Sequence, residues 1–249
     1  MSGTKPLLLA VLIDADNISP KWADAIFTEI ASLGEASVRR IYGDFTGQKL
    51  KGWKEKFAPL ALIPHLQVAH TIGKNSSDIA LVIDGMDLLH SKRVDGFCLV
   101  SSDSDFTRLA SRIREQGLPV YGIGQKKTPE AFRMACKRFI FVENLLEAEK
   151  PAAVDTSKTM ESIGQEVKKE PPSKAVPLIL AAMKNIPSED DWYTLSSIGS
   201  QLLAKTPDFD YRTYASSKLS DLLEATGQFE IDRSSLPARV RRKPSGAKK

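Results

Sequence analysis

The chain has 249 residues, of which 42% are hydrophobic and 27% charged, and its formal net charge at pH 7 is +4. This composition is ordinary for a globular protein with a sizeable core, and the net charge is too small to identify a partner. The charge is unevenly distributed, because the last 17 residues contain seven Lys or Arg and no Asp or Glu. Such a basic end commonly contacts phosphates, or it is a solvated terminus.

The two cysteines, Cys98 and Cys136, lack metal-ligand spacing and exclude a disulfide framework. The first apolar run, residues 7–13, is too short to span a membrane and is followed at once by acidic residues. We therefore expect a cytoplasmic protein without a membrane partner.

The first part of the chain alternates strand and helix patterns. Continuous apolar runs are typical of strands buried on both faces of a parallel sheet. In chain order the patterns predict strands at 7–13, 36–43, within 62–72, and at 96–102, 118–124 and 139–145, with helices at 21–34, 76–91, 104–117 and 128–138. This order predicts a three-layer α/β domain with a mainly parallel sheet.

The texture of the sequence changes after the last of these strands. Charge and Pro dominate a stretch with few large apolar residues, which we interpret as a linker. Helical patterns then follow at 176–186, 193–206 and 210–227, and a hairpin pattern follows at 228–243. Three helices and a hairpin predict a small winged helix. The predicted boundaries are 1–148 for the first domain, 149–175 for the linker, 176–243 for the winged helix and 244–249 for a basic tail.

Acidic residues stand where functional groups gather in a doubly wound sheet, beyond the carboxyl ends of the strands. The residues are Asp14 after the first strand, Asp78 near the start of a helix, and Asp103 and Asp105 after the strand at 96–102. If they converge in one crevice, each pair of charges ~4 Å apart costs about 4 kcal/mol at an effective dielectric near 20. Mg²⁺ or Mn²⁺ would compensate this repulsion and is suited to phosphodiester hydrolysis. The lack of His and Cys in these motifs argues against zinc.

Each acidic residue also has a structural interpretation. Asp103 is a good N-cap, Asp14 fits a turn, and Asp78 suits a helix N-terminus. Together the four favour function over structure. Asn17 is the better positioning group after the first strand, and Asp16 is either a ligand or a first-turn charge.

Asp84 lies six residues past Asp78 on the predicted helix. That spacing turns it about 120° away, so we expect Asp84 to face elsewhere unless it supports the site from behind.

The motifs "LIDADN", "SSDIALVIDGMDLL" and "LVSSDSDFTRLASRIREQG" together resemble the NYN family of PIN-like nucleases, over residues 7–146. The family usually has Gly where this chain has Ser102. The resemblance implies a metal-dependent RNA-cleaving site made by Asp14, Asp78, Asp103 and Asp105, with Asn17 beside them.

Residues 177–240 resemble the OST-HTH (LOTUS) module, a winged helix associated with RNA or protein partners. The stretch that shows this is "YTLSSIGSQLLAKTPDFDYRTYASSKLSDLLEATGQFEI", in which Ala215 replaces a frequent Gly. A nuclease-like domain followed by this module is a known bacterial arrangement.

Basic and aromatic residues around these motifs are candidates for holding RNA. Lysines follow phosphates and an exposed Trp stacks on a base, so single-stranded RNA is the expected form. The candidates are Lys49, Lys51 and Trp53 in "GQKLKGWKEKF", Lys74 before the Asp78 helix, Lys126 and Lys127 after a strand, and Tyr211, Arg212, Tyr214 and Lys218 in the last helix. Solvated lysines and a Trp packed on the core are the structural alternatives.

The sequence thus predicts a metal-dependent endoribonuclease with a tethered RNA-binding module. The main alternative is an RNA-binding adapter whose second module recruits a protein. A phosphatase is a third interpretation, because paired aspartates occur there too, although those enzymes need a nucleophilic Asp and a Lys in another order.

Overall fold

The computed structural model describes residues 5–66, 76–145, 169–188 and 190–243. The chain divides into two compact units, Met1–Lys150 and Pro151–Lys249. Each has its own hydrophobic core.

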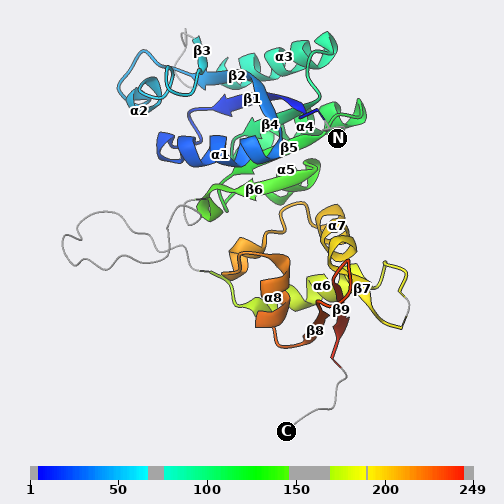
Figure 1. Ribbon diagram of the computed structural model, residues 1–249. Coiled ribbons are helices and arrows are strands. Elements are labelled where there is room, and N and C mark those ends of the chain that lie inside the picture. The colour runs from blue at the N-terminus through cyan, green and yellow to red at the C-terminus, as the bar shows by residue number, and fades with distance from the viewer. Residues whose placement is uncertain (1–4, 67–75, 146–168, 189, 244–249) are drawn as a thin grey trace, which may run out of the picture. The chain divides into compact units, whose positions relative to one another are not determined.

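Six parallel strands form the sheet of the first unit (Figure 1). Their order across the sheet is β3-β2-β1-β4-β5-β6. The strands are β1 (Leu8–Asp14), β2 (Glu35–Gly43), β3 (Ile63–Leu66), β4 (Gly96–Val100), β5 (Val120–Gly124) and β6 (Arg138–Phe141). The mainly parallel α/β fold expected from the apolar runs is therefore confirmed.

The strand order reverses between β1 and β4, which pair directly from Leu9 opposite Gly96 to Ile13 opposite Val100. The chain runs from β1 outward to β3, then returns to β4 and continues to the other edge. In open parallel sheets the crevice beyond such a switch point is the usual binding position. Asp14 ends β1 at this point.

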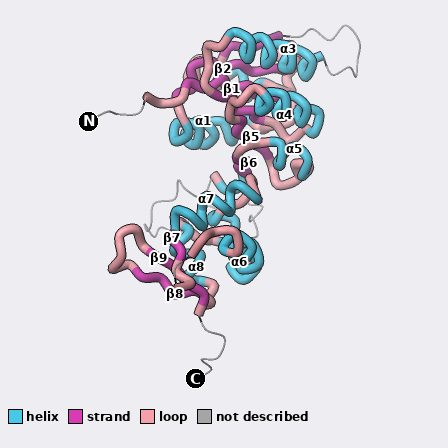
Figure 2. Tube along the Cα trace, turned by 90° about the vertical axis from the view of Figure 1, so that its right-hand side faces the viewer, coloured by secondary structure: helices cyan, strands magenta, loops and turns pink. Residues whose placement is uncertain are grey.

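Helices cover both faces of this sheet (Figure 2). One core cluster joins α1 (Ala23–Leu33) to odd-numbered β1 residues such as Val11, and the other joins the opposite face to even-numbered residues such as Leu12. The second face carries α3 (Ser76–Ser91), α4 (Thr107–Glu115) and α5 (Glu130–Ala135), and α2 (Lys51–Lys54) is a short helix between β2 and β3. Because β1 alternates between two buried faces, its sequence is continuously apolar.

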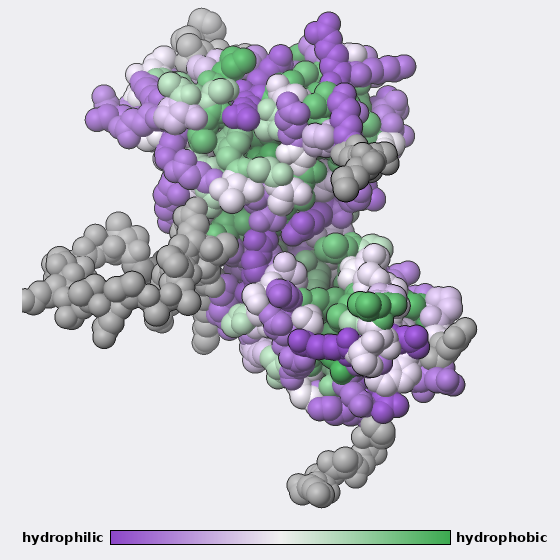
Figure 3. Space-filling model, in the orientation of Figure 1, coloured by the Kyte–Doolittle hydropathy of each residue, from purple (hydrophilic) through white to green (hydrophobic). Residues whose placement is uncertain are grey.

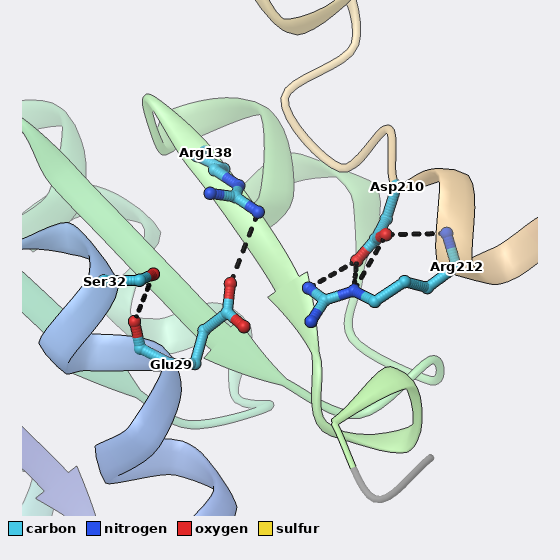
Figure 4. A network of polar contacts seen from close by, with 5 residues as sticks. All are labelled: Glu29, Ser32, Arg138, Asp210 and Arg212. Carbon is cyan, nitrogen blue, oxygen red and sulfur yellow. Dashed lines mark hydrogen bonds and ion pairs between the residues drawn. The ribbon is translucent and has the colours of Figure 1, made fainter. Parts of the chain in front are cut away.

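Polar contacts tie β6 to α1 at the edge of the first unit. The Arg138 guanidinium pairs with Glu29 at 3.3 Å, and the Ser32 hydroxyl donates to the Glu29 carbonyl oxygen at 2.7 Å (Figure 4). The edge strand is thus held by an ion pair as well as by its hydrogen bonds to β5.

The described residues of the second unit form three α-helices and a three-stranded antiparallel sheet of order β7-β9-β8. Its elements are α6 (Val176–Met183), β7 (Tyr193–Thr194), α7 (Leu195–Lys205), α8 (Leu219–Ala225), β8 (Phe229–Asp232) and β9 (Arg239–Arg242). Leu222 and Leu223 of α8 are fully buried beside Ile179 and Val240, as the apolar spacing predicts.

The predicted helix at 210–227 is wrong in its first half. The chain forms a 3-10 turn over Tyr211–Tyr214, and Ala215 then adopts a left-handed conformation with φ 55°. A residue in that conformation ends a helical turn, so α8 begins only at Leu219. Ala215 is where the related modules often have Gly, which adopts this conformation without strain.

The other predicted elements are confirmed in type, with small changes in their ends. The strand predicted within 62–72 is β3, which retains Pro64 because it lies at the sheet edge, and residues 67–72 lie outside the described residues. Most of the predicted linker also lies outside them. A 3-10 turn, Pro172–Ala175, places the buried Ala175 in the core of the second unit, within the range assigned to the linker.

Candidate active site

Asp14 is a buried carboxylate whose oxygens accept hydrogen bonds from four donors of the protein. Its side chain is 1% exposed. Oδ1 accepts the backbone N–H groups of Asp16 and Asn17 at 3.1 and 3.3 Å, and Oδ2 accepts the Asn17 amide at 2.6 Å and the Ser101 hydroxyl at 2.7 Å. Burial raises the pKa of Asp14, and these four hydrogen bonds oppose the rise. A carboxylate has about four acceptor positions, so donors from the protein fill all of them.

Ser101 joins the two strand ends at the switch point. Its hydroxyl donates to Asp14, at the end of β1, and accepts the backbone N–H of Asp103 at 3.0 Å, beyond β4. Ser101 is 1% exposed, so the loss of either bond would leave a buried polar group without its partner. The sequence analysis missed this residue, although it is a polar side chain directly after an apolar strand.

The neighbouring Gly124 shows how closely β5 approaches this loop. A Cβ at Gly124 would overlap the backbone oxygen of Ser101, so only glycine fits there without a shift. Ser102, which replaces the usual Gly of related sequences, accepts the backbone N–H of Gln125 at 2.9 Å. The loop after β5 is thereby attached to the loop that bears Asp103.

Asp103 and Asp105 begin a 3-10 turn, Ser104–Phe106, that leads into α4. Asp103 Oδ1 accepts the backbone N–H of Asp105 at 2.9 Å, so Asp103 is the N-cap that the sequence also allowed. Asp105 is exposed, and Asp103 is partly exposed. Capping uses one oxygen of Asp103, which leaves the structural and functional interpretations compatible.

Asp78 experiences the charges of the other acidic residues. Its pKa is raised to about 6, first by burial and then by the negative charges of Asp14, Asp103, Asp105 and Asp16, in that order. It lies in the first turn of α3. Asp78 therefore lies within electrostatic reach of acidic residues from two other segments of the chain.

The donor set fits a hard divalent cation by its chemistry, since it offers carboxylate oxygens and neither nitrogen nor sulfur. The carboxyl groups lie farther apart than the ligands of a bound metal ion do. Within residues 5–66, 76–145, 169–188 and 190–243, no three Asp, Glu, His or Cys side chains stand close enough to hold a metal ion. Asp14 in addition has its acceptor positions filled. Asp78, Asp103 and Asp105 are the carboxyl groups with capacity to spare.

A second polar cluster, centred on Asp84 with partners that the sequence did not indicate, holds α3 against the sheet. Asp84 Oδ2 accepts the Tyr42 hydroxyl at 2.8 Å and pairs with the Arg40 guanidinium at 2.9 Å and with His65 Nδ1 at 3.0 Å. Burial and the bond to Asp84 raise the pKa of Tyr42, while burial lowers the pKa of His65 against the opposing effect of Asp84. Tyr42 lies opposite Asp14 in the β1–β2 register. Asp84 thus supports the helix that bears Asp78 from behind.

Three of the predicted RNA-contacting lysines are exposed near the acidic residues. Lys49 pairs with Asp16 at 2.8 Å, and this bond raises the pKa of Lys49. Lys126 and Lys127 are exposed in the loop that Ser102 attaches through Gln125. Lys51 is exposed on α2, and Lys74 lies outside the described residues.

The prediction that Trp53 stacks on an RNA base is wrong. Trp53 is 0% exposed, and its indole N–H donates to the Ile18 carbonyl oxygen at 2.9 Å. The ring therefore anchors α2 to the loop after β1. Its flanking lysines face solvent because the helix is amphipathic, which the lysine-rich pattern did not distinguish from an RNA-binding face.

The outward face predicted for residues 211–218 is also largely wrong. Tyr214 is 8% exposed, and Tyr211 packs against the core of the second unit. The Arg212 guanidinium grips the buried Asp210 carboxylate at 2.8–3.0 Å (Figure 4). Of the four candidates Tyr211, Arg212, Tyr214 and Lys218, the exposed one is Lys218.

A parallel sheet of this order, with converging aspartates beyond its switch point, defines an α/β protein of the PIN-like kind. Comparison with family models identifies the family: the NYN domain model matches residues 8–146, and the OST-HTH/LOTUS domain model matches residues 166–240. The chain belongs to the NYN domain family and continues into an OST-HTH/LOTUS domain. NYN domains are generally nucleases, and OST-HTH/LOTUS domains bind RNA.

No curated protein matches the chain. Two solved structures are similar to parts of it. A protein of unknown function from Vibrio parahaemolyticus is 18% identical over 56% of this chain and 94% of its own, with a TM-score of 0.45. An uncharacterized protein from Nitrosomonas europaea is 27% identical over 40% of this chain and 98% of its own, with a TM-score of 0.28. Neither likeness bears on the function of this chain.

The helices in the described part of the chain are all too short or too polar to cross a lipid bilayer.

Proposed function

We propose that the protein is a metal-dependent endoribonuclease that hydrolyses RNA phosphodiester bonds at the acidic site of its first unit. The bridge through Ser101 carries the proposal, because its hydroxyl bonds both the Asp14 carboxylate and the Asp103 backbone N–H and so joins two acidic strand ends at the switch point. The pKa of Asp78, raised by burial and by the charges of these residues, supports it. Charges gathered in this way repel one another unless a cation or protonation compensates them. Membership of the NYN family supports a nuclease in particular.

Residues of the first unit would bind the metal ion, orient the Asp14 carboxylate and attract the RNA. Asp78, Asp103 and Asp105 would hold Mg²⁺ or Mn²⁺, and Asp14 would join them by giving up one of its four hydrogen bonds. When bound, the metal ion supplies a water of lowered pKa and neutralises phosphate oxygens. Asn17 and Ser101 orient the Asp14 carboxylate. Lys126 and Lys127 would attract the RNA backbone to the rim.

The second unit would hold the RNA, which we propose to be single-stranded, because unpaired bases expose faces that apolar and aromatic side chains can contact. A protein partner for this unit remains the alternative. Cys98 and Cys136 are both free and buried, which supports a reducing compartment and hence the cytoplasm.

The decisive experiment follows cleavage of an end-labelled single-stranded RNA with Mn²⁺. We expect cleavage that EDTA abolishes and that Asp103→Asn lowers at least a hundredfold, because the variant removes one charge from the set. A matched control is Asp95→Asn, which replaces a carboxylate that bonds the backbone N–H of Leu8 away from the site. Cleavage that survives both EDTA and Asp103→Asn would contradict the proposal.

One observation favours a second candidate, an RNA-binding adapter without nuclease activity. The four acceptor positions of Asp14 are satisfied within the protein, and the described residues contain no finished metal set. Tight RNA binding without cleavage of several RNAs, in Mg²⁺ and in Mn²⁺, would favour the adapter.

A further inference from the structure

The second unit has a groove between α6 and the small sheet. Its volume is about 570 Å³, within the range of ligand-binding clefts. Leu180 and Met183 of α6 and Tyr193 of β7 form an apolar floor. Tyr211, Arg212, Tyr214 and Lys218 do not line it, whereas Arg242, from the basic end of the sequence, does.

Two cations from different elements also line the groove. Lys184 caps the carboxyl end of α6, and Arg242 ends β9. Both side chains are exposed, and neither forms an ion pair with a described residue. Asp191 is the acidic residue of the lining, which leaves an excess of positive charge.

The register of β9 explains why Arg242 faces the groove. Alternate residues of a strand share a face, so Arg242 lies on the side of Val240, which is buried in the core. Arg241 points to the other face, where it pairs with Glu230 at 2.8 Å and lies 4.6 Å from the Trp192 ring centroid. Arg241 is therefore engaged within the unit, whereas Arg242 is left for a partner.

We propose that this groove is the RNA-binding surface of the second unit, and that it takes one or two unpaired nucleotides. Lys184 and Arg242 contact successive phosphates, and the floor of Leu180, Met183 and Tyr193 receives a base or ribose face. The inference rests on the proposed function, because it names the surface through which this unit holds the RNA. A floor without charged donors or acceptors discriminates little between bases. We therefore expect the groove to accept different bases and to prefer single-stranded RNA.

The occupant is argued from charge complementarity. Two cations that form no ion pair with a described residue, beside an apolar floor, match a polymer that alternates anionic and flat apolar groups, which single-stranded RNA does. A second copy of this chain would place the same cations against each other across a symmetric interface, at a cost in repulsion.

The test measures binding of a fluorescein-labelled 16-nucleotide single-stranded RNA to the full chain by anisotropy. EDTA is present, so the result does not depend on cleavage. We expect Lys184→Ala/Arg242→Ala to weaken binding about tenfold at low salt and to reduce the slope of log affinity against log salt by about 1.4, for two lost phosphate contacts. An abasic strand of equal length should bind the unaltered protein more weakly.

The matched control is Lys174→Ala/Lys205→Ala, which removes two exposed lysines of the same unit that do not line the groove. We expect it to retain affinity and salt slope. Equal losses of RNA affinity in the two double variants would show that the effect depends on net charge alone, and would overturn the proposal. Thermal unfolding of each variant checks the fold.

Other occupants give different results. Unchanged RNA affinity in Lys184→Ala/Arg242→Ala, with reduced affinity for a labelled polyglutamate peptide, would overturn the proposal in favour of an acidic protein. A dimer of the unaltered chain that this variant dissociates, with unchanged RNA affinity, would assign the groove to self-association. Cleavage assays in Mn²⁺ report separately on the first unit, so failure there leaves the binding result intact.

Discussion

Two aspartates of the acidic site balance their charge in different ways. Asp14 is buried among four hydrogen-bond donors that compensate its negative charge. Asp78 accepts no hydrogen bond from a described side chain, and burial, followed by the charges of its acidic neighbours, raises its pKa to about 6. A bound cation would therefore compensate more negative charge near Asp78 than near Asp14.

This contrast predicts a pH-dependent gain of stability in Asp78→Asn without metal. The pKa of the carboxyl is raised from 3.8 to about 6 in the folded chain, so the unfolded chain releases the proton first as pH rises. The folded protein therefore loses stability as pH rises from about 4 through 6, and the whole destabilisation caused by the ionised Asp78 is present above that range. Asn bears no charge, so we expect the variant's advantage in unfolding midpoint to be larger at pH 8 than at pH 4.5, measured in EDTA.

The matched variant is Asp87→Asn, an exposed position on the same helix, which should show little change between the two pH values. An Asp78→Asn protein that is less stable than the parent at pH 8 would mean that Asp78 acts as a helix cap.

Ser101→Ala should destabilise the protein through its buried neighbours. The change removes the donor to the buried Asp14 carboxylate and the acceptor of the partly buried Asp103 N–H. A buried group left without its partner costs about 1–3 kcal/mol. Urea unfolding measures the loss. Ser104→Ala, exposed three residues further on, should change the unfolding free energy by less than about 0.5 kcal/mol. Equal losses would show that Ser101 has no special role.

At the scale of elements, α3 is joined to the sheet by Asp84 and its three donors. Asp84→Ala would leave Arg40 without its carboxylate and the buried Tyr42 hydroxyl without its acceptor. We expect a loss of about 1–3 kcal/mol in unfolding free energy. Asp87→Ala on the same helix is the control, and its loss should be within about 0.5 kcal/mol. Similar losses in the two would indicate that helix propensity, and not this network, governs the change.

The elements that sequence predicts well are those set by local patterns. The apolar run of β1 identifies a doubly buried strand, and Gly34 ends α1 by donating to the Ile30 carbonyl oxygen. Long-range contacts are not written in such patterns. Trp53 is buried because Ile18, 35 residues away, accepts its N–H, and Asp84 finds donors on β2 and β3.

The acidic site lies between these cases. Acidic residues after parallel strands must lie at one edge of the sheet, so the topology predicts that they gather. Whether Asp14 points its oxygens at a cation or at Asn17 and Ser101 depends on side-chain geometry that no pattern encodes. The break at Ala215 similarly depends on one backbone angle, because a left-handed alanine leaves no periodic signal.

At the scale of the whole molecule, the chain divides its work between two separately packed cores. One core surrounds the sheet that bears the aspartates, and the other holds the small antiparallel sheet with its groove. Because the linkage between the units is covalent, RNA bound by one unit stays at high effective concentration for the other.

Truncation after Lys150 tests this division. The first unit keeps its own core and all four aspartates, so we expect the truncated chain to stay folded and to retain its turnover number on saturating RNA. Loss of the tethered surface should raise KM at least tenfold, since tethering multiplies affinity without new contacts at the site. The measurement is steady-state cleavage of a single-stranded RNA by both chains at equal Mn²⁺, with circular dichroism as the check of folding. A KM equal to that of the full chain would assign the second unit to a protein partner, whereas a fall in turnover at unchanged KM would mean that it completes the catalytic site.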